Sequence, residues 1–106
     1  MINSDGMGHG DETLRQRLLV NYLRTLVELE TPPQAILLYA AGVKMVINTS
    51  PCRAEITRLR EAGTRVIACR TCLDHYGLME HVPEAEIGNM LMIVEAQGAA
   101  AKVITL

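Results

Sequence analysis

Residues 63–78 of the chain read GTRVIACRTCLDHYGL. Residues 65–68 (RVIA) form a short, mostly apolar run that is typical of a buried strand, and Cys69 stands where this strand ends. Residues 72–79 then read as a short helix. Gly63 ends the helix before the strand, because glycine readily adopts the left-handed conformation found after helix C-termini. A helix, a strand and a helix in direct succession predict a layered sheet with crossover helices.

The alternation of strands and helices extends in both directions from this segment. Residues 35–40 (AILLYA) are an almost unbroken apolar run, which suits a strand buried on both faces of a parallel sheet. The predicted strands are residues 1–3, 35–40, 65–68, 85–87 and 102–106. The predicted helices are residues 11–30, 51–62, 72–79 and 88–97, with one or two further turns at 42–48. This order predicts an α/β fold with right-handed crossovers.

The first predicted helix has clear boundaries, whereas the first predicted strand does not. Asp11 and Glu12 open the helix with charges that suit its dipole, and the prolines in residues 31–33 end it. Its apolar residues recur at intervals of four and three: Leu14, Leu18, Tyr22, Leu26 and Leu29. The strand at residues 1–3 is abnormally short. Either this strand is stunted or the natural chain extends upstream of Met1.

Length and composition fit one domain spanning residues 1–106 with an aliphatic core, since only 3% of the residues are aromatic. The net charge of -2 and the scattered arginines argue against a nucleic-acid binder. Most arginines, Arg15 among them, are expected on solvated faces. No apolar run reaches the roughly 20 residues of a membrane span, and residues 1–10 do not resemble a secretory signal. We therefore expect a cytoplasmic protein whose cysteines are free thiols.

Cys69 is the strongest candidate for chemistry. Sites on a parallel sheet lie beyond the carboxyl ends of the strands, where backbone N–H groups can stabilise a thiolate. Cys72 follows three residues later, so the two sulfurs can face each other across one helical turn. Cys72 can then resolve a sulfenate or persulfide on Cys69, form a redox disulfide with it, or only pack. Packing alone is also an alternative for Cys69, and Cys52 is expected to be structural.

A second loop, residues 4–10 (SDGMGHG), is predicted at the same edge of the sheet. Gly6 and Gly8 permit a tight turn beside Cys69. His9 is a candidate proton shuttle or positive neighbour of Cys69, or else a solvated loop residue. The loop lacks the glycine spacing of phosphate-binding motifs, and Asp5 would repel an anion. A nucleotide or flavin is therefore a minor alternative, with Tyr76 as the only stacking ring near the site.

Arg70 and His75 complete the candidate site, since both can add positive charge near Cys69. Cys69, Cys72, His75 and His81 are spaced as C-x2-C-x2-H-x5-H, which is not a familiar zinc pattern. We therefore expect no metal and no other cofactor.

Three stretches of the sequence together resemble a known family: INSDGMGHGDETL, LLYAAGVKMVINTSP, and GTRVIACRTCLDHYGL followed by IGNM. Over residues 2–106 the chain resembles the DsrE/DsrF-like superfamily, and within it the C-terminal domain of the YedF-type proteins of selenium and sulfur metabolism. The resemblance implies a three-layer α/β/α domain with a five-stranded parallel sheet, in which the strands lie in the order 4-3-2-1-5.

The resemblance also implies a sulfur-relay protein or sulfurtransferase, in which a cysteine after a strand carries sulfur as a persulfide. By position that cysteine is Cys69, with Cys72 as an auxiliary thiol. Arg70, His9 and the loop backbone would stabilise the thiolate. The implied partners are a TusA-like sulfur carrier and further copies of the chain, as a trimer or hexamer. YedF-type proteins usually carry a TusA-like domain upstream, which residues 1–106 do not include.

Two other functions remain open. A dithiol oxidoreductase would use Cys69 and Cys72, which follow a strand and enter a helix as a CxxC motif. A non-catalytic oligomeric binding or regulatory module would instead use exposed apolar side chains as subunit contacts. These are expected among Leu37, Met45, Met90 and Met92.

Overall fold

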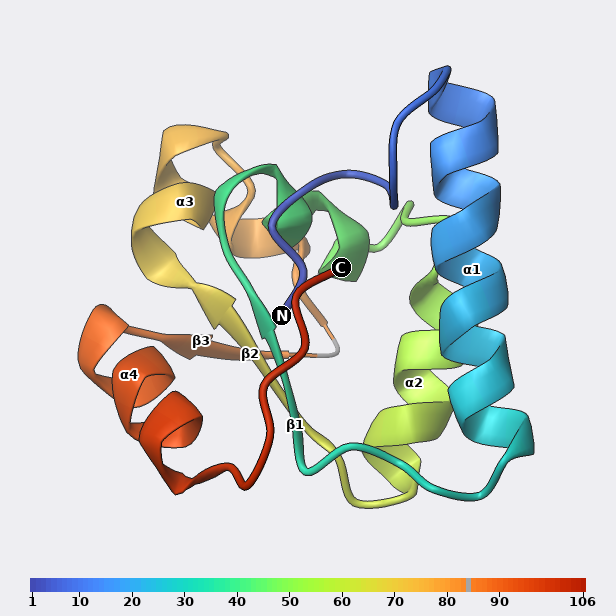
Figure 1. Cartoon of the computed structure of the whole chain (residues 1–106). Helices are drawn as coiled ribbons and strands as arrows, with labels where there is room; N and C mark the ends of the chain where they lie inside the picture. The colour runs from blue at the N-terminus through green and yellow to red at the C-terminus, as the bar shows by residue number, and fades with distance from the viewer. Residues whose placement is uncertain (84) are drawn as a thin grey trace.

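A parallel sheet lies at the centre of the computed structural model, which describes residues 1–83 and 85–106 (Figure 1). Within these residues the sheet has three strands, β1 (Ala35–Leu38), β2 (Arg65–Cys69) and β3 (Glu86–Gly88), in the order β1-β2-β3. Both pairings are parallel. The α/β class and the parallel sheet are confirmed. The prediction of five strands is wrong.

The two segments predicted as outer strands lie beside the sheet without forming strands. Ile2 makes a single parallel bridge with Leu38. Its N–H donates to the Leu37 carbonyl at 2.8 Å, and its own carbonyl accepts from Tyr39. The Leu106 N–H donates to the carbonyl of Met1 at 3.0 Å. The segments therefore lie in the expected order, but pairing through one or two residues is too short for a ladder.

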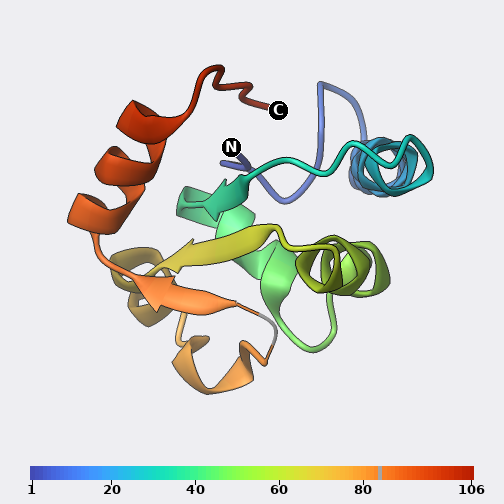
Figure 2. The same cartoon turned by 90° about the horizontal axis from the view of Figure 1, so that it is seen from below.

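Helices cover both faces of the sheet, as Figures 1 and 2 show. Helices α1 (Glu12–Glu28) and α2 (Arg53–Glu61) lie on one face, and α4 (Met90–Ala99) lies on the other. Capping side chains begin two of them: Asp11 accepts from the Leu14 N–H of α1, and Asn89 accepts from the Met92 N–H of α4, both at 2.9 Å. The expected three layers are thus present.

Short helices lie at the carboxyl end of the sheet. The 3-10 helix η1 (Ala40–Val46) follows β1, α3 (Arg70–His75) follows β2 without a loop, and η2 (Met79–His81) follows α3. The segment predicted as one helix at residues 72–79 is thus two, because Gly77 adopts a positive φ of 66° between them.

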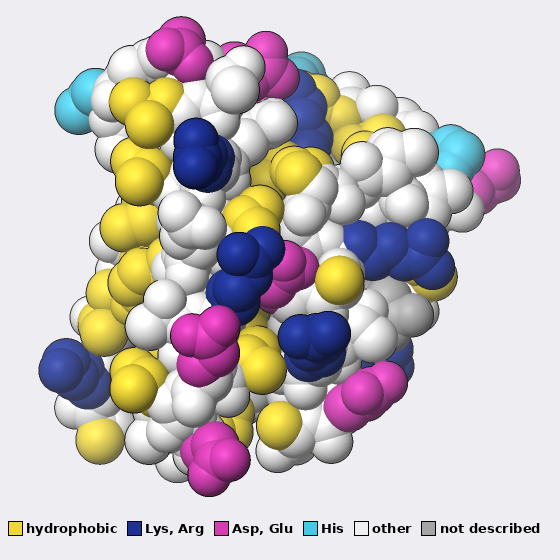
Figure 3. Space-filling model, turned by 90° about the vertical axis from the view of Figure 1, so that its right-hand side faces the viewer, with side chains coloured by type: hydrophobic (Ala, Val, Ile, Leu, Met, Phe, Trp, Pro, Cys, Tyr) yellow, Lys and Arg dark blue, Asp and Glu magenta, His cyan; other side chains and the backbone are white. Residues whose placement is uncertain are grey.

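Helix α1 buries a different face from the one predicted. Leu19 and Leu23 are fully buried, whereas Leu14, Leu18 and Leu29 are exposed. Leu26, which is partly buried, belongs to the same face. The buried residues of α1 thus also recur at intervals of four and three. Figure 3, which looks onto this side of the molecule, shows hydrophobic side chains along the length of α1. Helix α1 has more leucines than the rest of the protein covers, so some of them remain at the surface.

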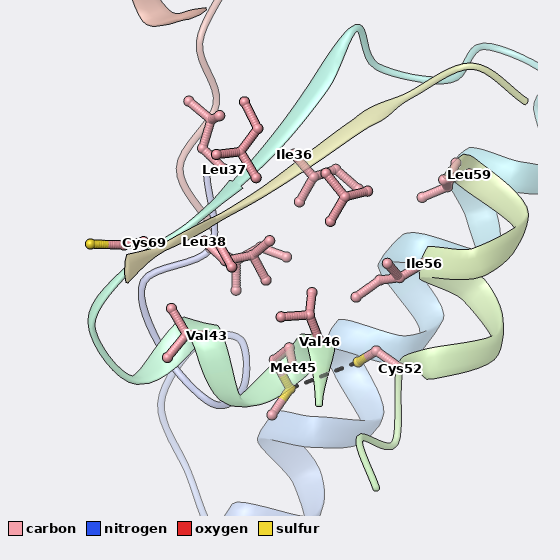
Figure 4. Packing of buried hydrophobic residues seen from close by; sticks show 14 of the residues in the cluster. Ile36, Leu37, Leu38, Val43, Met45, Val46, Cys52, Ile56, Leu59 and Cys69 are labelled. Atoms are coloured by element: carbon pink, nitrogen blue, oxygen red, sulfur yellow. Dashed lines mark hydrogen bonds between the residues drawn. The ribbon is translucent and has the colours of Figure 1, made fainter. Parts of the chain in front are cut away.

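The core lies between the sheet and these helices and is aliphatic, as expected (Figure 4). Leu37 and Met45 are buried within it, so the prediction that they form subunit contacts is wrong. Met90, on α4, is exposed, and Met92 is partly buried. Only part of the predicted contact set is therefore at the surface.

Candidate functional site

Cys69 is the last residue of β2 and the N-cap residue of α3. Its position in the sheet is opposite Gly88 of β3, at the carboxyl end of the strands. In Figure 4 its sulfur points away from the aliphatic side chains of the core. The residue is nevertheless only 2% exposed, so neighbouring segments cover the sulfur.

Cys72 lies one turn along α3 from Cys69, and hydrogen bonding between the two thiols is one cause of its raised pKa. It is less buried than Cys69. The backbone N–H of Ala40, at the start of η1, donates to the Cys72 Sγ at 3.1 Å. Ala40 has a φ of 50°, a left-handed conformation that costs a residue with a side chain about 1 kcal/mol. The strained turn therefore aims an amide donor at the second sulfur of the pair.

The surroundings of Cys72 raise its pKa. Burial is the largest cause, and the hydrogen bond to Cys69 is the second. The amide of Ala40 acts in the opposite direction, and the charge of Cys69 adds to the increase. The raised pKa keeps the Cys72 thiol neutral, with a proton that it can give up at this edge of the sheet.

A second contact joins η1 to α3. The Nζ of Lys44 lies 4.5 Å from the ring centroid of Tyr76, which is the C-cap residue of α3. The ring of His75 packs edge-on against Tyr76 with centroids 5.0 Å apart. Tyr76 is thus a support for a cation rather than a free stacking ring. Sequence reasoning missed Lys44, since a single lysine in an apolar segment gives no signal of its partner.

The comparisons with known proteins agree with the fold described above. The sequence matches the DsrE/DsrF-like family over residues 8–106. The chain belongs to this family. No sequence among curated proteins matches it.

Two solved structures share the DsrE/DsrF-like fold of this chain. The ychN protein from E. coli has a TM-score of 0.66 and 21% identity, over 99% of this chain and 96% of that one. MTH1491, a protein of unknown function from Methanobacterium thermoautotrophicum, has a TM-score of 0.71 and 24% identity, over 99% and 94%. At these identities the likeness concerns the fold.

The glycine loop of this DsrE/DsrF-like chain is tied to α1 rather than to the cysteines. Arg15 donates to the Asp5 carboxylate at 3.0 Å, to the hydroxyl of Ser4, and to the Gly8 carbonyl at 3.3 Å. Gly6 packs so closely that an added Cβ would lie 2.6 Å from the Arg15 Cβ. Arg15 is therefore a loop anchor, and the expectation of a solvated face is wrong for it.

The remaining predicted site residues are exposed. The side chains of His9 and Arg70 form no hydrogen bond or ion pair with any other residue that the structure describes. The loop that carries His9 runs from the sheet to the start of α1, on the side of the molecule away from α3 (Figures 1 and 2). The structure thus brings Cys69, Cys72, His75 and Tyr76 together and leaves the loop apart.

Cys52 has no role at this edge of the DsrE/DsrF-like sheet. It is fully buried at the start of α2, and its sulfur contacts the Sδ of Met45 at 3.9 Å. Burial and the nearby Glu55 carboxylate raise its pKa to about 12, although a hydrogen bond with Ser50 acts against them. Such a thiol stays neutral at physiological pH.

Two further kinds of site were sought in residues 1–83 and 85–106. No three His, Cys, Asp or Glu side chains come together there as metal ligands, and no helix is long and apolar enough to cross a membrane. A cavity of about 650 Å³ lies between α1, β1 and the C-terminal segment, and its lining includes Tyr22, Ile36 and Val103. None of the cysteines lines it, so it is separate from the thiol pair.

Proposed function

We propose that this DsrE/DsrF-like chain is a sulfur-relay protein, or sulfurtransferase, in which Cys69 carries the transferred sulfur as a persulfide. One observation carries the proposal: two thiols lie one helical turn apart at the carboxyl edge of the sheet, and a strained turn donates an amide to one of them. Proteins of this family often act in sulfur relay, which supports the same function. Selenium, which undergoes the same chemistry, is included in the proposal.

The proposed reaction uses both thiols. The Cys69 thiolate attacks the outer sulfur of a donor R–S–SH, so a new S–S bond forms on Cys69 while the donor S–S bond breaks. The leaving R–S⁻ takes a proton, for which the neutral Cys72 thiol, one helical turn from Cys69, is a source on the protein. Burial of Cys69 protects the persulfide from water and from other thiols.

The test is incubation with a persulfide donor, followed by mass spectrometry of the intact protein and its peptides. We expect one added sulfur atom on Cys69, lost in Cys69→Ala and retained in Cys52→Ala as a matched control. Cys72→Ala should load more slowly, because it lacks the proton donor. No sulfur on Cys69 of the wild type, under conditions in which glutathione is persulfidated, would overturn the proposal.

A second candidate is a dithiol oxidoreductase, favoured by the spacing of Cys69 and Cys72, one helical turn apart at the end of a strand. A disulfide between them requires the two sulfurs to approach to about 2 Å. A redox titration of the pair against glutathione separates the candidates. A stable, reversible Cys69–Cys72 disulfide without sulfur loading would favour the oxidoreductase, and a pair that never oxidises would exclude it.

The proposed partners are a TusA-like sulfur carrier and further copies of the chain, as a trimer or hexamer in the cytoplasm. Helix α4 supports the oligomer, because Met90, Leu91 and Val94 on it are all more than half exposed. Such an apolar surface is usually covered by a partner. If the chain is instead a regulatory module, Cys69→Ala and Cys72→Ala would leave its biological role intact.

Light scattering on one pair of variants tests the oligomer. Leu91→Glu on α4 should lower the mass of the assembly, whereas Leu29→Glu, at an equally exposed leucine after α1, should not. A monomeric wild type, or the same effect from both variants, would contradict the role of α4.

A further inference from the structure

We propose that Lys44 is a specificity-determining residue, which selects small anionic donors for the Cys69–Cys72 pair, and that Tyr76 positions its ammonium group. The biological meaning of this inference rests on the proposed sulfur relay. The attraction of anions to the two sulfurs by the Lys44 charge does not depend on that function.

The two contacts between η1 and α3 place the cation near the sulfurs. One contact is the Ala40 N–H on the Cys72 sulfur, and the other is the Lys44 ammonium on the Tyr76 ring. The Tyr76 N–H donates to the Cys72 carbonyl at 3.1 Å, so the two residues are one helical turn apart. One turn of four residues advances about 6 Å. Lys44 therefore lies along the same seam as the thiol pair.

The charge of Lys44 is available to a ligand. Among the residues that the structure describes, the Lys44 ammonium has no carboxylate partner, and it lies over the Tyr76 ring. An aromatic face holds an ammonium group in place without neutralising it. Asp74 lies on α3 two residues from Cys72, and residues two apart do not share a helix face. An approaching anion thus meets a positive charge that is held on the same short helix as the two sulfurs.

A neutral reagent gains nothing from this charge, whereas an anionic one is concentrated by it. Small sulfur donors such as persulfides and thiosulfate are anions at physiological pH. The arrangement therefore favours an anionic sulfur donor over a neutral one. Lys44 would act on the approach of the donor and not on the bond that breaks.

The test compares two alkylating reagents of the same chemistry, anionic iodoacetate and neutral iodoacetamide. Peptide mass spectrometry gives their rates at Cys72 and Cys69 in the folded protein. We expect Lys44→Gln to lower the ratio of the iodoacetate rate to the iodoacetamide rate about three- to ten-fold, and high salt to remove the difference. Lys44→Arg should restore the ratio. Lys102→Gln, at the only other lysine, is the matched control and should leave it unchanged.

Variants of Tyr76 test its positioning role. Tyr76→Phe keeps the ring and should keep the wild-type ratio, whereas Tyr76→Leu should lower it towards that of Lys44→Gln. A general loosening of α3 would change both reagent rates together, because it acts on access and not on charge.

The outcomes separate this inference from the proposed function. An unchanged ratio in Lys44→Gln, an equal change in both rates, or no alkylation of either cysteine in the folded wild type would overturn the role of Lys44. Absence of sulfur loading with a normal ratio effect would instead overturn the relay and leave the anion selection standing.

Discussion

Cys52 and Cys69 have similar positions relative to a helix but very different surroundings. Each is the residue immediately before a helix, Cys52 before α2 and Cys69 before α3, and each is almost completely buried. Cys52 faces a methionine sulfur and has the Glu55 carboxylate nearby. Cys69 faces a second thiol, which itself receives a backbone amide.

The difference shows that burial and a place at a helix start do not by themselves fix the surroundings of a sulfur. The pKa of a thiol depends on its burial together with the charge and hydrogen-bonding capacity of the groups around it. Burial first, and then an acidic neighbour, favour the neutral thiol of Cys52. At the sheet edge, a proton donor lies next to Cys69 instead.

The largest expected contrast is in alkylation of the thiols. With a pKa of about 12, about one Cys52 thiol in ten thousand is ionised at pH 8. We expect Cys52 to react with iodoacetamide about a thousand-fold more slowly than a free cysteine, and far more slowly than Cys72. Time-resolved peptide mapping measures these rates. In urea all three cysteines should react alike, and a fast Cys52 in the folded protein would break the comparison.

The next effect concerns η1, which contributes Ala40 to the surroundings of Cys72 and Met45 to those of Cys52. A Cβ on Gly42 would lie 2.1 Å from the carbonyl oxygen of Ile2, and a backbone atom cannot move aside easily. We expect Gly42→Ala to lower the free energy of unfolding by about 3 kcal/mol or more. Urea denaturation measures it. Gly98→Ala in α4 is the control: its Cβ meets nothing within 4 Å, so it should stabilise by about 0.5–1 kcal/mol.

A smaller effect is expected at Ala40, whose positive φ turns its amide towards Cys72. Ala40→Gly removes the steric strain while keeping the N–H. We expect it to raise the free energy of unfolding by up to about 1 kcal/mol. The same substitution at Ala41, which has an ordinary negative φ, should destabilise the protein. Destabilisation by Ala40→Gly would show that the turn is not strained.

The smallest expected change is in the titration of Cys72. Its pKa is raised by burial first, and then by the hydrogen bond to Cys69. Cys69→Ala removes the second cause and leaves the first and the Ala40 amide in place. The pKa of Cys72 should therefore fall, and its alkylation should begin at lower pH than in the wild type. Cys52→Ala should leave that pH profile unchanged, and a shift to higher pH in Cys69→Ala would contradict the coupling.

Much of the fold could be predicted from short segments. The apolar runs at residues 35–40 and 65–68 became β1 and β2, because an unbroken apolar run is stable only when both faces of a strand are covered. The strands predicted at residues 1–3 and 102–106 could not be judged from the sequence. Whether Ile2 and Leu106 belong to strands depends on how many backbone hydrogen bonds their segments form with the neighbouring strand. The prediction of the buried face of α1 was wrong for a similar reason. The helix carries more than one row of leucines, and the tertiary structure decides which row is buried.

The sequence by itself determined that Cys69 ends a buried strand and that Cys72 follows one turn later. Both facts depend on local periodicity and on steric limits of the backbone. Only the tertiary structure decided which groups surround each sulfur: Ala40 is 32 residues from Cys72, and the ring that holds Lys44 lies equally far along the chain. Hydrogen bonds and charge act over a few ångströms in space, so distance along the sequence does not reveal them.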